Sequence, residues 1–276
     1  MGPLRCARAR TPREIADGQR VRFRVYVEEE RLLSSMAGRE GREIDERDDD
    51  AGTVHLVAYD GEEPVGTVRL LRARPTLEAE PRLGLELEST FTLAAMGPGV
   101  VAGEVTRYCV ARSHRGTRVA GMLYALLRAE SARCGITHWF ASANMQTDSP
   151  EDAALVYELV CRRRLVDDVF AATPRATAPP GLARRLSCYT SEQRRRARRG
   201  DDDALPLPVP VALFAARMGA RYIGPPAFDA TFGVFALPLV ASPYYSRVST
   251  STTNPVLPTG ASAASHGPSN PGTGSS

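Results

Sequence analysis

The order of sequence patterns between Thr53 and Cys134 constrains the fold of this chain more than any other feature. Two β-type runs, 53–59 and 64–71, flank Asp60-Gly61, a dipeptide typical of tight hairpin turns. A third β-type run, 100–110, leads through a basic, glycine-containing turn into a helical repeat of apolar residues that ends at Cys134-Gly135. Hairpin, strand, turn and helix in this order predict an α+β domain in which helices cover a sheet.

Further patterns extend this domain in both directions. Thr11-Pro12-Arg13-Glu14 has the form of a capping box with proline at the first helical position, and predicts a helix that runs to about Leu33. The remaining predicted elements, in chain order, are a strand at 136–141, a helix at 150–165 opened by Ser149, a short helix at 211–218 and a terminal β-hairpin within 222–239.

Composition sets the expected domain limits. We expect a flexible amino terminus at 1–10, one domain at 11–245 and a disordered tail at 246–276, which is rich in Ser, Thr, Gly and Pro. Within the domain, 171–205 is rich in Arg and Pro and has the character of a solvated insertion.

Several classes of protein are excluded or disfavoured. No apolar run approaches the roughly 18 residues that a membrane helix needs, and the amino terminus lacks the apolar stretch of a secretory signal, so we expect a cytoplasmic protein without a membrane span. Five scattered cysteines suggest reduced thiols, and four histidines without metal-ligand spacing predict no metal site. All 35 basic residues are arginine, but the net charge is only +3, and aspartates follow the densest arginine run, so nucleic-acid binding is not expected.

The turn after the third strand has features of a phosphate-binding loop. Free backbone amides and the helix dipole favour an anion where a strand leads into a helix, and Arg115 and Arg118 can add charge-assisted bonds. The stretch His114-Arg115-Gly116-Thr117-Arg118-Val119-Ala120, together with the elements around it, resembles the donor loop of the GNAT acyltransferases, although Arg118 stands where that family has its central glycine. The resemblance implies a GNAT-like fold with a mixed central sheet and a donor site formed by residues 115–120. A plain surface turn is the alternative.

Polar motifs elsewhere resemble a more specific set of relatives. They are Arg22-x-x-Val25-Tyr26, Glu43-Ile44-Asp45-x-x-Asp48, Gly66-Thr67-Val68-Arg69-Leu70 and Glu104-Val105-Thr106-Arg107-Tyr108-Cys109-Val110. Their order along the chain resembles that of the corresponding motifs in the autoinducer (acyl-homoserine-lactone) synthases and the long-chain N-acyl amino acid synthases. The resemblance implies that Arg22, Asp45 and Asp48 bind the acceptor and that Glu104, Arg107 and Arg69 act at the reacting centre. The bland alternatives are a solvated acidic run at 43–50 and a solvent-exposed Glu104 and Arg107.

The implied reaction is transfer of a fatty acyl group from a thioester to an amine. A free α-amino group has a pKa of roughly 8, so it needs a base; we assign that role to Glu104, with backbone amides near Val110 polarising the thioester carbonyl. Strict alternation along a strand places Glu104 and Arg107 on opposite faces, so a bulge or twist is needed to bring both to one cleft. We expect Cys109 and Trp139 to belong to the core.

The expected substrate is an acyl-phosphopantetheine thioester, carried by acyl carrier protein or coenzyme A, with no tightly bound cofactor. The carrier protein is favoured because the loop departs from the coenzyme pattern, and the acceptor is an amino acid or a similar small amine. Three alternatives stay open: an acyl-homoserine-lactone synthase, disfavoured because 28–41 contains no aromatic residue to hold S-adenosylmethionine; an ordinary acetyl-coenzyme A acetyltransferase; and a non-catalytic GNAT-like binding module.

Overall fold

The computed structural model describes residues 2–33, 38–75, 82–176, 186–200 and 205–244. All of them belong to one compact unit, which spans Met1–Tyr245. The predicted tail at 246–276 and part of the predicted insertion lie outside the described residues, so both remain predictions. No helix in the described ranges is long and apolar enough to cross a membrane.

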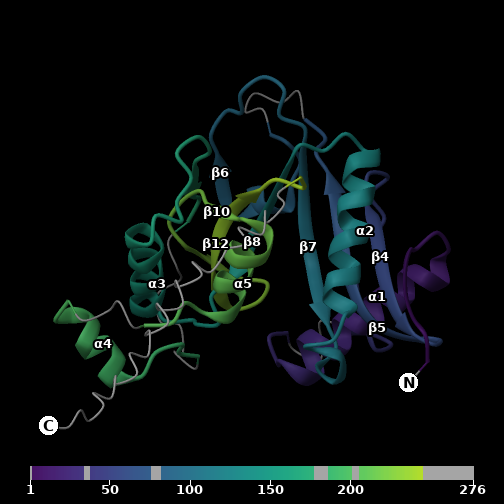
Figure 1. Cartoon of the computed structure of the whole chain (residues 1–276), viewed down its shortest axis with the longest axis horizontal. Coiled ribbons are helices and arrows are strands. Elements are labelled where there is room, and N and C mark those ends of the chain that lie inside the picture. Colours follow the sequence, from purple (N-terminus) through teal and green to yellow (C-terminus); the bar gives the residue numbers. More distant parts are fainter. Residues whose placement is uncertain (1, 34–37, 76–81, 177–185, 201–204, 245–276) are drawn as a thin grey trace, which may run out of the picture. The chain divides into compact units, whose positions relative to one another are not determined.

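One mixed eight-stranded sheet organises the fold (Figure 1). Along its path lie β1 (Leu4–Arg8), β4 (Val54–Asp60), β5 (Glu63–Arg72), β7 (Ala102–Val110), β8 (His138–Asn144), β12 (Val234–Ala241) and β10 (Arg221–Tyr222), while β11 (Ala227–Asp229) pairs with β12. Neighbours are antiparallel except β7 and β8, which are parallel. Two small ladders join β2 (Gly38–Arg39) to β3 (Arg42–Glu43) and β6 (Phe91–Leu93) to β9 (Ala172–Pro174).

Helices cover both faces of the sheet. The helical elements are α1 (Pro12–Phe23), the π-helix η1 (Arg24–Glu29), α2 (Val119–Arg133), α3 (Pro150–Arg162), α4 (Ser191–Arg198), α5 (Val209–Met218) and the short 3-10 turns η3 (Glu86–Ser89) and η4 (Arg112–His114). A Cβ on Gly18 of α1 would meet Thr67, and one on Gly66 would meet Val119 of α2. Adjacent residues of a strand point to opposite faces, so α1 and α2 pack on opposite sides of β5.

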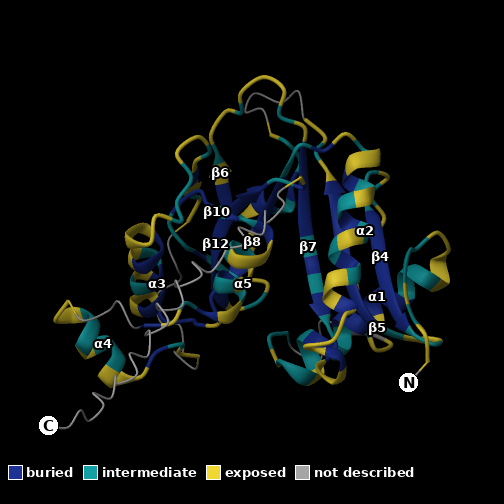
Figure 2. Ribbon diagram, viewed as in Figure 1, coloured by how far each residue is buried: buried dark blue, intermediate teal, exposed yellow. Residues whose placement is uncertain are grey.

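The strands form the buried centre of the molecule (Figure 2). The larger apolar cluster lies on the α2 face and includes Leu123, Val156, Val211 and Trp139, whose indole Nε1 donates to Ser131. A smaller cluster on the other face joins η3, β6 and β9 to the sheet. Trp139 is therefore a core residue, as predicted. By contrast, α4 buries no residue.

The sheet parts between β7 and β8. These strands pair only where Ala102–Glu104 faces His138–Phe140. Beyond Glu104, β7 continues beside β5 alone, and the ribbons of β7 and β8 diverge (Figure 1). The opening therefore begins at Glu104 and widens toward Val110, where the chain enters the turn before α2.

Most of the predicted elements are confirmed, with three corrections. The first helix starts with the predicted capping box but ends as a π-helix at Glu29, short of Leu33. Within the amino terminus predicted to be flexible, residues 4–8 form β1, which pairs with the edge of β4 and packs Leu4 and Cys6 against the core. The predicted solvated insertion contains β9 and α4; β9 is ordered by its pairing with β6.

Candidate functional site

The six charged residues assigned to the acceptor and the reacting centre lie together in one buried cluster. Arg22 comes from α1, Asp45 and Asp48 from the loop after β3, Arg69 from β5, and Glu104 and Arg107 from β7. The structure adds Glu43 and Glu86 to them. The sequence motif included Glu43 without a role. Glu86 has no local pattern that would have identified it, since η3 is brought to β7 only by tertiary packing.

Arg22 and Asp48 form the innermost pair. The Arg22 side chain, almost fully buried, donates from Nη1 to Asp48 Oδ1 at 2.7 Å, and its Nε lies 2.5 Å from Glu43 Oε2. Burial alone would raise the pKa of Asp48, but the hydrogen bonds and charge of Arg22, with the charge of Arg69, hold it well below its usual value. Asp48 is therefore a fixed negative charge.

Arg69 and Arg107 share their carboxylate partners. Arg69 contacts Asp45 at 2.5 Å, Asp48 at 2.8 Å and Glu86 at 2.6 Å. Arg107 contacts Asp45 at 2.7 Å and Glu86 at 2.8 Å, so two carboxylates bridge the two guanidinium groups. Carboxylates of the protein itself thus engage both guanidinium groups, and neither group is left open to hold the carboxylate of an acceptor.

A β-bulge brings Arg107 into this cluster. Across the β5–β7 ladder, Arg69 faces Thr106 and Thr67 faces Cys109, so two residues of β7 lie opposite Val68 alone. Arg107 has a φ of 55°, a left-handed conformation that one class of bulge adopts and that is uncommon for a residue other than glycine. The bulge required to bring Glu104 and Arg107 to one cleft is therefore present after Thr106: Arg107 joins the face of Glu104, and Tyr108 turns to the α2 face, where its hydroxyl donates to the Ala120 carbonyl.

Glu104 is buried at the point where β7 and β8 part. Its Oε1 accepts the Leu87 amide at 2.9 Å, whereas Oε2 is buried and has no hydrogen-bond partner among the described residues. Burial, followed by the negative charge of Glu86, raises the pKa of Glu104 to about 8. A carboxyl group of this kind can exchange a proton near neutral pH, and one of its oxygens is free to do so.

Tyr26 and Phe232 close the cluster on the side of α1. Their rings meet edge to face at 5.2 Å, and the Arg107 guanidinium lies 5.2 Å from the centre of the Phe232 ring. Phe232 belongs to the turn between β11 and β12, so the last hairpin reaches across to β7. Cys109 packs with Val21 and Val25, and burial raises its pKa to about 12, which is consistent with the predicted core role and not with a nucleophile.

The predicted donor loop lies at the open end of β7. Gly116 has a φ of 78°, Thr117 donates its hydroxyl to the His114 carbonyl, and Val119 is buried as the first residue of α2. Within the described residues, the amides of Ala120 and Gly121 have no acceptor, as expected in the first turn of a helix. These amides are available to an anion.

The two arginines of this loop differ. Arg115 contacts Glu30 at 2.7 Å and Glu29 at 3.2 Å, and its Nε donates to the Val110 carbonyl. Its charge is therefore balanced by the end of the π-helix. Arg118 precedes α2, is exposed and has no ion-pair partner among the described residues, which makes it the cation of the loop that is free to meet a ligand.

Val110 lies opposite Gly66 on the ladder, and the next residue, Ala111, donates its amide to Val65. Successive amides of a strand point to opposite sides, so the Val110 amide points away from β5, toward the side on which β7 has no partner. This is the orientation that the predicted contact with a thioester carbonyl requires.

The most exposed side of the cluster, formed by Asp45 and Glu86 and called its mouth below, is acidic. Three guanidinium groups meet four carboxylates besides Glu104. The arginine side chains are at most 5% exposed, whereas Asp45 is 20% and Glu86 is 28% exposed. A ligand that approaches the cluster therefore meets carboxylates first, which favours a cation such as an ammonium group.

Comparisons with known proteins agree with this architecture. Residues 21–125 match the acetyltransferase (GNAT) domain family. The chain is 32% identical over 178 residues to the L-ornithine N(alpha)-acyltransferase of Rhizobium meliloti (strain 1021), an alignment that covers 60% of this chain and 58% of that protein. The chain thus spans somewhat more than half the length of this relative.

Two solved structures are among those to which the chain is similar. FeeM, an N-acyl amino acid synthase from uncultured soil microbes, superposes with a TM-score of 0.45 at 11% identity and covers 88% of this chain and 93% of its own. The coenzyme A-dependent acyl-homoserine lactone synthase BjaI gives 0.45 at 18% identity, covering 84% of this chain and 77% of its own. With the family match, the predicted fold class, an α+β GNAT fold with a mixed sheet and flanking helices, is confirmed.

Proposed function

We propose that this chain, a relative of the GNAT acyltransferases, is an N-acyltransferase that moves a fatty acyl group from a phosphopantetheine thioester to an amino acid that carries a second amine, such as L-ornithine. The observation that carries the proposal is Glu104, which is buried, has one free carboxyl oxygen and lies where β7 and β8 part. The identity with an L-ornithine N(alpha)-acyltransferase supports the acceptor class.

In the proposed reaction, ionised Glu104 takes one proton from the α-ammonium group of the acceptor. The neutral amine attacks the thioester carbonyl, and a backbone amide on the unpaired side of β7 next to Glu104 would stabilise the negative charge on the carbonyl oxygen. The C–N bond forms, the C–S bond breaks, and the departing thiolate takes the second proton of the nitrogen. The products are an amide and a thiol, and Glu104 returns its proton to water.

The charged cluster would position the acceptor and its base. Asp45 and Glu86 at the mouth would hold the second, unreactive ammonium group, since they are the exposed members of a cluster with surplus negative charge. Arg22, Arg69, Arg107 and Asp48 would act as positioning residues, because their donors and acceptors are already engaged with one another.

For the donor, we propose acyl carrier protein rather than coenzyme A. Arg115 is balanced by Glu29 and Glu30, which leaves Arg118 and the amides at the start of α2 to hold phosphate. A carrier-bound phosphopantetheine presents one phosphodiester, whereas coenzyme A presents a pyrophosphate and a further phosphate. One free cation suits the smaller charge.

The direct test incubates the purified chain with L-ornithine and hexadecanoyl thioesters of acyl carrier protein or coenzyme A. We expect N-hexadecanoyl-ornithine by mass spectrometry, with one thiol released per amide. We also expect a drop in turnover of at least a hundredfold for Glu104→Gln, within the usual range for a lost general base. Glu158→Gln, an exposed substitution on α3, is the matched control and should retain full activity.

Other products would contradict the proposal in distinct ways. Use of acetyl-coenzyme A alone would indicate an ordinary acetyltransferase, and a homoserine lactone formed from S-adenosylmethionine would indicate an autoinducer synthase. Salt-sensitive binding of nucleic acid without thioester consumption would indicate a non-catalytic module.

A further inference from the structure

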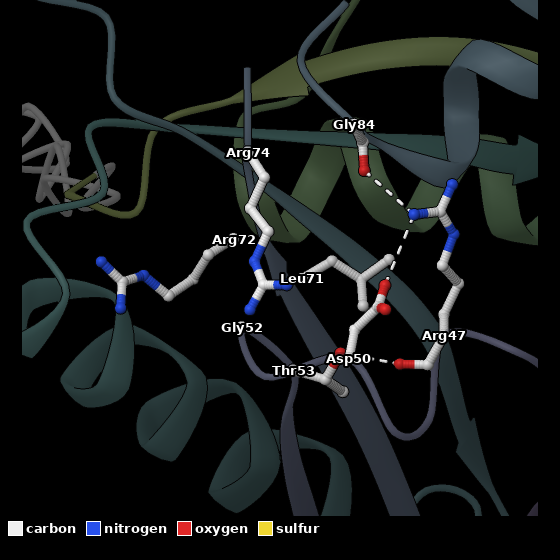
Figure 3. A pocket seen from close by; sticks show the side chains of 8 residues that line it. All are labelled: Arg47, Asp50, Gly52, Thr53, Leu71, Arg72, Arg74 and Gly84. Carbon is white, nitrogen blue, oxygen red and sulfur yellow. Dashed lines mark hydrogen bonds and ion pairs between the residues drawn. The ribbon is translucent and has the colours of Figure 1, made fainter. Parts of the chain in front are cut away.

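A hollow of about 190 Å³ lies beside Leu71 and Arg72, at the end of β5 that is farther from the predicted donor loop. Figure 3 shows the side chains that line it. It is lined by Arg47, Arg72 and Arg74 together with Asp50, Gly52, Thr53, Leu71 and Gly84. Three guanidinium groups against one carboxylate make it basic. Since one water occupies about 30 Å³ of liquid, the hollow has room for a carboxylate and the atoms that carry it.

Two of its arginines are uncommitted. Arg47 donates to the Gly84 carbonyl at 3.3 Å and contacts Asp50 at 3.4 Å, so it is held in the wall of the hollow. In the part of the chain that the structure describes, neither Arg72 nor Arg74 has a carboxylate partner, and both are exposed. The Arg74 guanidinium lies against Gly52, where a Cβ would come within 3.1 Å of its Nε.

Three residues that line the hollow, Arg47, Gly84 and Leu71, adjoin the acidic cluster. The Arg47 amide donates to Asp45 Oδ1 at 2.8 Å. Gly84 is two residues from Glu86, and Leu71 faces Glu104 directly across the β5–β7 ladder. A basic hollow beside an acidic mouth has the charge pattern of a zwitterionic amino acid, with its carboxylate on one side and its ammonium groups on the other.

The position of the hollow argues against the donor as its ligand. Arg72 pairs with Gly103 at the start of β7, whereas Gly66 pairs with Val110 at the parted end, next to the donor loop. Six residues of strand separate these points, roughly 20 Å at about 3.3 Å per residue. A donor phosphate at the start of α2 is therefore far from the hollow.

From these contacts we propose that the hollow formed by Arg47, Arg72 and Arg74 binds the carboxylate of the amino acid acceptor. This inference rests on the proposed function and deepens it: the buried arginines of the cluster are occupied by protein carboxylates, so the acceptor carboxylate is held by Arg72 and Arg74 instead. The hollow would thereby distinguish an amino acid from the corresponding amine.

The test uses two acceptors that differ only in this group, L-ornithine and 1,4-diaminobutane. In Arg72→Gln/Arg74→Gln, the KM for L-ornithine should rise about tenfold or more, the loss expected for charge-assisted hydrogen bonds. The KM for 1,4-diaminobutane, the KM for the thioester and kcat should stay within twofold. Arg217→Gln, an exposed substitution on α5, is the matched control and should change none of these constants.

Equal shifts for both acceptors would overturn the proposal, and so would a shift confined to the thioester, which would assign the hollow to the donor. If the wild-type chain acylates no amine, the proposed function fails, but calorimetric titration with L-ornithine still tests the hollow. Weaker binding to the double variant than to wild type would support the carboxylate site, and equal binding, or none to either protein, would contradict it.

Discussion

Arg22 is the residue on which the charged cluster depends most. It is 1% exposed and contacts both Asp48 and Glu43. In Arg22→Gln, two buried carboxylates would lose their main cationic partner, a change that typically costs about 3–5 kcal/mol. We expect the free energy of unfolding in urea to fall by about that amount, whereas Arg217→Gln should change it by less than about 0.5 kcal/mol. A loss below about 1 kcal/mol would contradict the buried pairing.

Glu104 should make stability depend on pH in an unusual direction. Its pKa rises from 4.5 to about 8 on folding, so between these values the folded chain holds a proton that the unfolded chain has lost. The contribution of this group is therefore fully present below pH 4.5 and is lost as the pH rises toward and through about 8. Measured as the difference between wild type and Glu104→Gln, stability should decline from pH 5 to pH 9. A flat or rising difference would mean that Glu104 is not buried as a neutral group.

Sequence motifs located most of the charged residues of the site but not their mutual arrangement. The family resemblance singled out six charged residues, and the structure places them near one another; their roles remain predictions. They are Arg22, Asp45, Asp48, Arg69, Glu104 and Arg107. Glu86 was missed, since its role depends on η3 packing against β7 across the chain. The engagement of Arg69 and Arg107 by carboxylates was also missed, because spacing does not show which pairs form.

Among the structural elements, the bulge in β7 shows where local pattern fails. Period-two alternation alone places Glu104 and Thr106 on one face, as observed, but misplaces the residues from Arg107 on. The need for a bulge or twist followed only from the resemblance, which brought Glu104 and Arg107 to one cleft. The left-handed conformation at Arg107 is stabilised by three carboxylates that come from other elements. A tertiary network therefore decides the register, and no window of the local sequence contains it.

The π-helix η1 was equally hidden from the sequence. Glu30 donates its amide to Val25, five residues back, which widens the helix at its end. Both carboxylate oxygens of Glu29 accept the Arg112 amide, and Arg115 contacts Glu29 and Glu30. This end of the first helix therefore holds the start of the predicted donor loop in place. The sequence indicated where that loop lies along the chain, but not these contacts.

The contact between β9 and the end of β10 gives a test at the scale of elements. A Cβ on Gly224 would lie 2.0 Å from the Ala172 carbonyl oxygen, a backbone atom that cannot rotate away. Gly224→Ala should lower stability by about 1–3 kcal/mol, the usual range for overpacking. The matched control is Gly121→Ala, in an open position on α2, which should raise stability by about 0.5–1 kcal/mol. Thermal unfolding of both variants checks this, and a neutral Gly224→Ala would show that the strands are not in close contact.

On the scale of the whole molecule, the opposite ends of the sheet would have separate tasks under the proposed function. The open end of β7 leads into the predicted donor loop, and the paired end borders the basic hollow and includes Glu104. Donor and acceptor would then approach the base from opposite directions.

The choice of donor is a property of this whole arrangement. With hexadecanoyl groups on both carriers, we expect kcat/KM to be at least tenfold higher for acyl carrier protein than for coenzyme A. Arg118→Gln should lower the value for the carrier-bound donor without altering the KM for L-ornithine, because Arg118 lies at the donor end only. A preference for the coenzyme, or an effect of Arg118→Gln on the acceptor, would contradict this assignment.

The central claim is that Glu104 takes the proton of the attacking amine, and the pH dependence of kcat/KM tests it most directly. In wild type, kcat/KM for L-ornithine should rise with pH and level off above about pH 8, as Glu104 ionises. In Glu104→Gln the level reached above pH 8 should fall at least a hundredfold, and the remaining slow rise with pH should follow the ionisation of the amine. A Glu104→Gln variant that reaches the wild-type level above pH 8 would show that another group is the base.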